Sequence, residues 1–320
     1  MTQDTAKPIP EYRNCMLCPR MCGANRTDGE TGVCGETAAC RVASTVPHHG
    51  EEPSFSGSRG SGTVFFAGCS CQCFFCQNDQ VSHRHLGTDY EVRELLAALR
   101  TLIERGVHNL NFVTPTHFWP HVRRACEQLR REGTTLPFLY NTSGYERPGL
   151  IPEVAEQMDV FMPDMKFASA ELADACTSAP DYPETAMAAL AEMVKAKGFL
   201  EPWDPTGNRP ARTGVLVRHL VLPGEVENTL AVLRRLRHEF GRMLPLSVMS
   251  QFRPMPACRS RGLLERPVTA AEYGQVTAAI RELDFQQVYI QPHHGDDNYL
   301  PDFTRDEPFR GNRCRNKTRP

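Results

Sequence analysis

The stretch Gly68-Cys69-Ser70-Cys71-Gln72-Cys73-Phe74-Phe75-Cys76-Gln77-Asn78 directly follows the apolar run Thr63-Val64-Phe65-Phe66-Ala67. Cys69, Cys73 and Cys76 are spaced C-x3-C-x2-C, with an aromatic residue just before the last cysteine. A four-iron cluster held by four thiolates is coordinatively closed and mainly transfers electrons. Three thiolates leave one iron free to bind a substrate or a cofactor. The spacing therefore predicts an open [4Fe-4S] cluster on this loop.

Other metal sites could use some of the same cysteines. Cys73-x2-Cys76 alone is also typical of half a zinc knuckle, or of a redox dithiol in a thioredoxin-like unit. With Cys71 included, the loop could in principle close a site of four thiolates. Eight residues form a tight loop for surrounding one metal from four sides, so we interpret Cys71 as a non-ligand. The interpretation requires a strand before the loop.

Composition limits the class of protein. The chain has 320 residues and a formal net charge of -2, which is enough length for one large α/β barrel or two ordinary domains. A nearly neutral chain does not favour nucleic acid or an anionic membrane as a partner. The first residues have no apolar core of a signal peptide, and no stretch approaches the roughly 18 apolar residues of a membrane span. We expect a cytoplasmic protein.

The cysteines point to metal rather than to disulfides. Nine of the 13 lie before residue 77, and in a reducing cytosol such clusters are usually metal ligands. A second complete set of four thiols, with Cys40 nearby, has the spacing C-x2-C-x3-C-x11-C and consists of Cys15, Cys18, Cys22 and Cys34. It could hold structural zinc or an auxiliary iron–sulfur cluster, and both remain open. His48 and His49 read as loop residues.

The chain divides into three regions. Residues 1–62 form a cysteine-rich, metal-binding segment, residues 63–291 alternate strands with helices, and residues 292–320 form a polar tail with a basic run from Arg310 to Arg319. Near-continuous apolar runs favour parallel strands buried on both faces. The expected strands are 63–68, 109–114, 137–141, 159–163, 214–222, 245–250 and 287–291.

Amphipathic helices are expected between these strands. One begins at the capping box Thr88-x-x-Glu91 and another at Thr269-x-x-Glu272, and two more cover about 183–197 and 225–239. Strand–helix alternation predicts an α/β fold, either doubly wound or a partial barrel. The segment 199–213 is rich in turn residues and reads as an insertion, for which a hairpin is one candidate form.

Polar residues follow or interrupt almost every expected strand. In parallel barrels the carboxyl ends of the strands converge, so these residues are expected to form a ring around one cavity. Besides Cys69 and residues 250–253, the ring contains Thr114, Thr116, His117, Asn141, Ser143, Asp164, Lys166 and Arg218.

Each ring residue also has a structural explanation. His117 could face water at a helix N-terminus, and Asn141 and Ser143 could simply hydrogen-bond a turn. Asp164 and Lys166 could form a surface ion pair of little energetic weight. Arg218 lies within the apolar run 215–221, where an unpaired charge is costly, and we expect Asp164 to be its partner.

The chain from about residue 15 to residue 291 resembles the radical S-adenosylmethionine (SAM) superfamily. Within it, the chain is similar to the pyruvate formate-lyase activating enzyme homologues often labelled PflX. One matching stretch is Gly68–Asn78, which we call the cluster loop. The others are Cys15–Gly23, Gly32–Gly35, Glu51–Pro53, Gly60–Thr63, Val113–His117, Tyr140–Tyr145, Met162–Lys166, Ala179–Tyr182, Arg218–Gly224 and Met249–Gln251.

The resemblance implies a partial (β/α)6 radical-SAM barrel, a [4Fe-4S] cluster on Cys69, Cys73 and Cys76, and SAM as co-substrate. In the superfamily, SAM bound at the open iron is reduced to methionine and a 5′-deoxyadenosyl radical that abstracts hydrogen. Phe75 matches a position whose backbone lies near the adenine. Thr114 to His117 stand where many members carry a Gly-Gly-Glu motif, which is absent here. The remaining matches to positions that contact SAM or substrate are Asn141, Asp164, Lys166 and Arg218.

The resemblance also implies partners. A flavodoxin or ferredoxin would supply electrons, and the substrate would be a glycyl radical enzyme or another polypeptide, with the 199–213 insertion or the basic tail as candidate lids. The alternatives are radical modification of a different protein, peptide or small molecule, or a two-zinc interaction module without enzymatic activity. A nucleic-acid-binding form of that module would need basic patches with interleaved aromatics, which the sequence lacks.

Overall fold

The computed structural model describes residues 9–293 and 300–309. The described strands are β1 (Cys40–His48), β2 (Ser61–Phe66), β3 (Thr88–Tyr90), β4 (Leu110–Val113), β5 (Phe138–Thr142), β6 (Val160–Pro163), β7 (Gly214–Val215), β8 (Val217–Leu220), β9 (Leu246–Met249) and β10 (Val288–Ile290). The α-helices are α1 (Pro53–Ser56), α2 (Asp79–Ser82), α3 (Val92–Glu104), α4 (Trp119–Arg131), α5 (Ile151–Gln157), α6 (Ala170–Thr177), α7 (Tyr182–Lys197), α8 (Val226–Phe240), α9 (Pro256–Arg261) and α10 (Ala270–Glu282). Short 3-10 helices are η2 (Pro10–Tyr12), η3 (Arg26–Asp28), η4 (Thr116–Phe118) and η5 (Pro148–Leu150).

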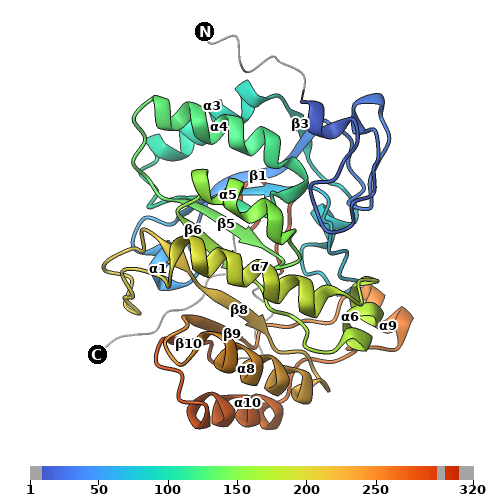
Figure 1. The fold of residues 1–320 in the computed structure, drawn as a ribbon, viewed down its shortest axis with the longest axis vertical. Coiled ribbons are helices and arrows are strands. Elements are labelled where there is room, and N and C mark those ends of the chain that lie inside the picture. Colours follow the sequence, from blue (N-terminus) through green and yellow to red (C-terminus); the bar gives the residue numbers. More distant parts are fainter. Residues whose placement is uncertain (1–8, 294–299, 310–320) are drawn as a thin grey trace.

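The strands form two sheets that are mostly parallel (Figure 1). One has the order β3-β1-β2-β4-β5-β6-β7 and the other the order β10-β9-β8. All neighbours are parallel except β1, which runs antiparallel to both β2 and β3. A backbone bridge between Asp164 and Arg218 connects the two sheets. The predicted α/β fold with a cysteine-rich N-terminal segment is confirmed, and its arrangement resembles a partial barrel.

The two faces of the sheet differ because successive side chains of a strand point to opposite sides. On the outer face, Val64, Phe66 and Phe112 share one apolar core with Leu95 and Leu99 of α3. Further helices, α4, α5, α7, α8 and α10, lie along the same outer side in Figure 1. On the inner face, Leu139, Met162 and Leu216 form a smaller core with Phe55 of α1.

Three local predictions differ from the structure. The expected strand 214–222 is divided into β7 and β8, which belong to different sheets. The sequence suggested no strand before residue 63, yet β1 pairs with β2 in the main sheet. The predicted helix start at Thr88 is wrong because Thr88 pairs with Val42 as part of β3. The capping box is formed instead by Glu91 and Glu94, and the helix begins at Val92. By contrast, the box at Thr269 and Glu272 caps α10 as predicted.

The insertion 199–213 is a hairpin whose arms meet at Glu201 and Thr213. The amide of Ala211 donates to the carbonyl of Ser54 in α1 at 2.8 Å, and α1 precedes the start of β2. The hairpin therefore lies at the amino end of the parallel strands, far from the cluster loop at their carboxyl end, so its proposed role as a lid is wrong.

The tail that we expected to be extended packs on the sheet where it is described. Phe303 is buried, and its ring centroid lies 5.1 Å from that of Phe65 on the inner face. The amide of Phe303 also donates to the side chain of Gln80 in α2 at 2.7 Å. The basic run from Arg310 to Arg319 lies outside the described residues. In residues 9–293 and 300–309, no helix is long and apolar enough to cross a membrane.

Candidate functional site

The cluster loop follows β2 directly, as its motif requires. Gly68 turns the chain out of the strand with φ +75°, and its amide donates to the carbonyl of Val81 at 2.9 Å. A Cβ atom on Gly68 would lie 2.5 Å from Cγ of Glu36 and 2.7 Å from the carbonyl oxygen of Cys34. Only glycine fits here, because the N-terminal segment packs against the turn.

The three predicted ligands lie together on this loop. Cys73 is buried, whereas Cys69 and Cys76 are half-buried. Burial, followed by the proximity of Cys73 and Cys76, raises the pKa of Cys69 to about 12. Burial and then Cys73 also raise the pKa of Cys76. Neighbouring thiols on the loop thus disfavour the ionisation of Cys69 and Cys76, and a bound cation would relieve this repulsion.

Cys71 lies against one of these thiols. Its sulfur is 3.4 Å from that of Cys73, and its amide donates to the sulfur of Cys69 at 3.4 Å. The hydrogen bond with Cys71 is the main cause that raises the pKa of Cys73, followed by burial. Its assignment as a non-ligand stays a prediction.

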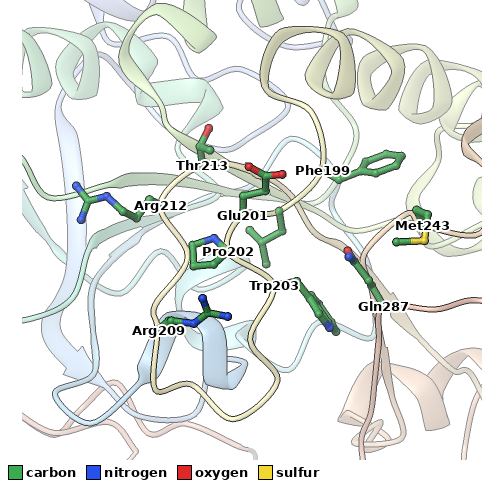
Figure 2. Close-up of a pocket in the computed structure, with 10 residues that line it drawn as sticks. Phe199, Glu201, Pro202, Trp203, Arg209, Arg212, Thr213, Met243 and Gln287 are labelled. Carbon is green, nitrogen blue, oxygen red and sulfur yellow. The ribbon is translucent and has the colours of Figure 1, made fainter.

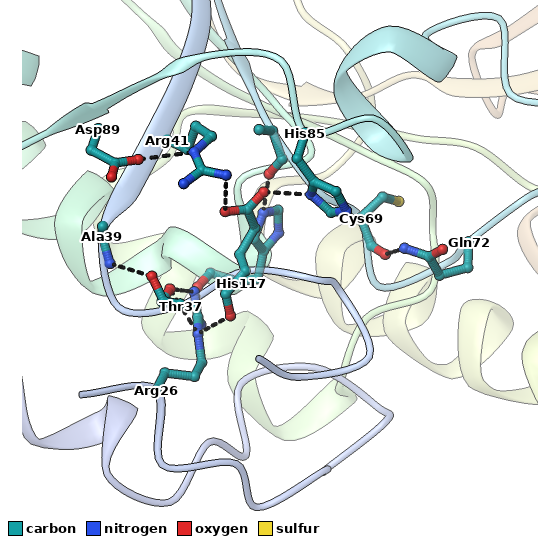
Figure 3. Close-up of polar contacts among 11 residues, drawn as sticks. Arg26, Thr37, Ala39, Arg41, Cys69, Gln72, His85, Asp89 and His117 are labelled. Carbon is teal, nitrogen blue, oxygen red and sulfur yellow. Dashed lines mark hydrogen bonds and ion pairs between the residues drawn. The ribbon is translucent and has the colours of Figure 1, made fainter. Parts of the chain in front are cut away.

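The rest of the loop is fixed by other segments. Figure 3 shows the side chain of Gln72, which donates to the carbonyl of Cys69 at 2.7 Å. The amide of Phe74 donates to the carbonyl of Cys176 at 3.1 Å, at the end of α6. Phe75 is buried, with its ring 5.9 Å from that of Phe252. A role of its backbone near adenine stays a prediction.

The segment after β4 holds polar residues that are buried in the interior. Thr114 has φ +52°, and its amide donates to the carbonyl of Asn141 at 2.7 Å. His117 is 1% exposed, and its Nε2 lies 2.7 Å from the carbonyl of Ala67. Burial and then the nearby Arg26 lower the pKa of His117 to about 3, so this imidazole is neutral. The alternative that His117 faces water is wrong.

A buried carboxyl that the sequence analysis missed lies beside this segment. Glu146 is 1% exposed and accepts hydrogen bonds from the hydroxyls of Thr116, at 2.6 Å, and of Thr142. Among the described residues no group bonds its second oxygen. Burial raises the pKa of Glu146 to about 7 despite these hydrogen bonds. Its only sequence signal is an acidic residue in a turn directly after a strand.

The backbones of Arg218 and Asp164 form a bridge between the two sheets, but their side chains do not form an ion pair. Arg218 forms a buried ion pair with Glu51 and Glu52, which follow β1, and its Nε donates to Glu52 at 2.9 Å. Asp164 pairs instead with Lys166. The predicted Arg218–Asp164 ion pair is therefore wrong. Lys166 neutralises Asp164, and Glu51 and Glu52 neutralise Arg218.

The Asp164–Lys166 pair lies close to the cluster loop. Burial opposes the charge of Lys166, but Asp164 and then Cys73 outweigh it and raise the pKa of Lys166 above its usual value. The same ammonium lowers the pKa of Cys73 in return, although other causes dominate there. The hydroxyl of Ser143, at the end of β5, is 8% exposed and lacks a hydrogen-bond partner among the described residues. A buried hydroxyl without a partner is expected where a ligand binds.

The N-terminal cysteines lie in one segment, and two of them, Cys22 and Cys34, lie on either side of Gly32. Cys15, Cys18 and Cys34 are buried and Cys22 is exposed. The pKa of Cys18 is raised to about 12, mainly by burial and in part by Cys34 and Cys15. A Cβ atom on Gly32 would lie 2.9 Å from the sulfur of Cys22 and 3.6 Å from that of Cys34. Four thiols are a suitable donor set for zinc or for iron–sulfur. Across both described ranges, no group of three or more metal-ligating side chains converges on one ion position.

The N-terminal segment is anchored to the sheet by a buried arginine. Arg26 is 1% exposed, and its guanidinium donates to the carbonyls of Thr37, at 2.7 Å, and His117, at 2.5 Å (Figure 3). It also lies over the ring of Tyr12, 4.4 Å from the centroid. Nearby, Glu36 accepts from Nδ1 of His85 at 2.7 Å. These contacts hold the N-terminal cysteines beside the cluster loop.

An open groove of about 640 Å³ lies elsewhere, on the hairpin (Figure 2). Its lining includes Trp203, Arg209 and Arg212 from the hairpin and Met243 and Gln287 from outside it. Since the hairpin is at the amino end of the strands, the groove is separate from the cysteine loop.

Comparisons with known proteins give distant similarities. No protein-family model matches the chain. An uncharacterized protein of Methanocaldococcus jannaschii, MJ0674, is 22% identical over 287 residues, which cover 87% of this chain and 77% of that protein.

Among solved structures, methylornithine synthase (PylB) has a TM-score of 0.43 and 17% identity over 69% of this chain. Streptococcus suis SuiB, solved with its precursor peptide SuiA, has a TM-score of 0.47 and 10% identity over 71% of this chain. The chain spans 60% of the PylB chain and 47% of the SuiB chain.

We expect the ionisation of Glu146 to make the stability depend on pH. Its folded pKa, about 7, exceeds the ordinary 4.5, so its contribution is fully present below pH 4.5 and is lost as pH rises through 7. The loss is on the order of 3 kcal/mol at pH 8. We expect the free energy of unfolding, measured with urea on metal-free, reduced protein, to fall less between pH 5 and pH 8 in Glu146→Gln than in the wild type. Glu156→Gln, at an exposed position of α5, should retain the wild-type dependence; equal losses in all three proteins would contradict the assignment.

Proposed function

We propose that Cys69, Cys73 and Cys76 hold a [4Fe-4S] cluster with one open iron, and that the protein reductively cleaves SAM there. The observation that carries the proposal is that all three thiols lie on one short loop directly after β2, where burial, Cys73 and Cys76 raise the pKa of Cys69. The backbone amide of Cys71 already points to the sulfur of Cys69, which suits a thiolate ligand. When bound, the cluster would supply one electron to the sulfonium of SAM, giving methionine and a 5′-deoxyadenosyl radical.

The chain's own residues would bind and orient SAM. Lys166 lies near Cys73 and can bind an anionic group such as the SAM carboxylate. The unpartnered hydroxyl of Ser143, and Asn141 in the same strand end, offer further polar contacts. We assign Arg218 and His117 positioning roles instead, since Glu51 and Glu52 take the guanidinium and the carbonyl of Ala67 takes Nε2.

We further propose a polypeptide substrate, with a flavodoxin or ferredoxin as electron donor. This part is supported by the resemblance of the sequence motifs to glycyl-radical-enzyme activases. Radical modification of a small molecule and a two-zinc interaction module are the competing functions. The colour and iron content of anaerobically purified protein would separate the zinc module from both enzymatic functions, because only an iron–sulfur protein would be brown and rich in iron.

Replacing Cys69, Cys73 or Cys76 by Ala should abolish the cleavage of SAM to methionine and 5′-deoxyadenosine, because each removal leaves the cluster with two thiolates. Cys71→Ala is the matched control, since it removes a buried thiol from the same loop. It should retain cluster absorbance and SAM cleavage. Loss of the cluster in Cys71→Ala, with retention in one of the other three variants, would refute the ligand assignment.

The N-terminal set should bind its metal independently. A triple Ala variant of Cys69, Cys73 and Cys76 should still contain iron or zinc by elemental analysis, because Cys15, Cys18, Cys22 and Cys34 supply four thiolates without the barrel. Replacing Cys22 and Cys34 in that background should remove the remaining metal. A triple variant that is folded and metal-free would eliminate the second site.

The polypeptide proposal predicts a protein radical. Reduced protein and SAM, incubated anaerobically with glycyl radical enzymes of the same organism, should give a glycine-centred doublet in electron paramagnetic resonance (EPR) spectra. The Cys73→Ala variant should give none. SAM cleavage that produces a modified metabolite, with no radical on any candidate protein, would favour the small-molecule function.

A further inference from the structure

Arg20 connects the N-terminal cysteine segment to the cluster loop. It lies between Cys18 and Cys22, and its Nε donates to the carbonyl of Ser70 at 3.0 Å. Its Nη2 lies 3.5 Å from the carbonyl of Cys71. The guanidinium thus contacts two successive peptide groups of the loop, directly after the first predicted cluster ligand.

The same guanidinium contacts a third segment. Nη1 donates to the carbonyl of Ser178 at 2.5 Å, and Nη2 donates to that of Thr177 at 2.6 Å, at the end of α6. One side chain therefore donates hydrogen bonds to four carbonyls from two distant parts of the chain. Arginine suits this role because its five N–H groups are held in a rigid, planar fork.

A second contact strengthens the same connection. The amide of Cys69 donates to the carbonyl of Cys34 at 3.3 Å, and Gly68 leaves no room for a side chain between them. Cys34 is the last cysteine of the N-terminal set. The N-terminal set therefore contacts the part of the cluster loop from Gly68 to Cys71 at two places, through Arg20 and through Cys34.

We propose that Arg20 is a positioning residue that holds the cluster loop in its ligand-binding conformation, and that metal at the N-terminal cysteines holds Arg20. The turn from Cys18 to Cys22 is already closed by the amide of Met21, which donates to the carbonyl of Cys18 at 3.0 Å. Metal bound to both cysteines fixes the ends of this turn, and with them the backbone of Arg20. The proposal rests on the proposed function in that the loop carries the cluster.

Removing Arg20 has two separable effects on the loop. The carbonyls of Ser70, Thr177 and Ser178 lose the hydrogen bonds from Arg20, so the loop opens more often. The site also loses a positive charge close to the cluster ligands, which makes addition of an electron harder and shifts the reduction potential of a cluster to more negative values.

The experiment compares Arg20→Gln, Arg20→Lys and Arg147→Gln in the full-length chain. Arg147 is the matched control, because its guanidinium donates to the carbonyl of Met16 in the same N-terminal segment. Hydrogen exchange of residues 69–76 is measured without iron and with Zn²⁺ at the N-terminal site, and thermal unfolding checks each fold. The reduction potential and EPR spectrum are then recorded after cluster reconstitution.

In Arg20→Gln, exchange of residues 69–76 should be faster by about tenfold, the factor expected for losing a strong hydrogen-bond donor, and Arg147→Gln should match the wild type. In a triple Ala variant of Cys69, Cys73 and Cys76, whose loop itself cannot bind Zn²⁺, removing Zn²⁺ should speed the same amides. Arg20→Lys keeps the positive charge but lacks the planar guanidinium. The amides of residues 69–76 should therefore still exchange fast, whereas the reduction potential of the cluster should return towards the wild-type value.

Unchanged exchange in Arg20→Gln, or equal acceleration in Arg147→Gln, would overturn the positioning role. Exchange that ignores Zn²⁺ would overturn the link to the N-terminal metal. A wild type that takes up no iron–sulfur cluster and cleaves no SAM would instead refute the proposed function, while the exchange data would still decide whether Arg20 orders the loop.

Discussion

The hydrogen bond from the amide of Cys69 to the carbonyl of Cys34 is the contact on which the arrangement of the site depends. It joins two groups of cysteines that are far apart in the sequence, and it is possible because Gly68 has no side chain. The loop that carries Cys69, Cys73 and Cys76 is thus shaped from one side by the sheet and from the other by the N-terminal segment. The two cysteine groups form one structural unit.

Buried charges hold this unit to the barrel. Arg26 supplies donors to carbonyls of its own segment and of the segment after β4, and Arg218 is neutralised by Glu51 and Glu52. Breaking such a pair leaves a charge uncompensated in the interior, which costs far more than a surface ion pair. These charges therefore fix where the segments lie, and they leave Lys166 and the hydroxyl of Ser143 beside the cluster loop as candidate ligand contacts.

Much of the fold could be predicted because its signals are local. The apolar runs of the parallel strands and the capping box of Thr269 depend on neighbours in sequence, and the structure confirms them. The hairpin predicted for 199–213 is confirmed, but its role as a lid and the helix start at Thr88 were wrong because distant segments decided them. Pairing with Val42 drew Thr88 into a strand, and contact with α1 placed the hairpin at the amino end of the sheet.

For the site, the three-thiol loop could be predicted from the sequence, because the spacing of cysteines along a short loop does not depend on how distant segments pack. The sequence also determined the second set of four thiols. Which charges pair, the burial of His117 and Glu146, and the contact of Arg20 with the cluster loop could not be predicted from the sequence. The physical reason is that hydrogen bonds and burial depend on which distant segments meet, and that is settled when the whole core packs.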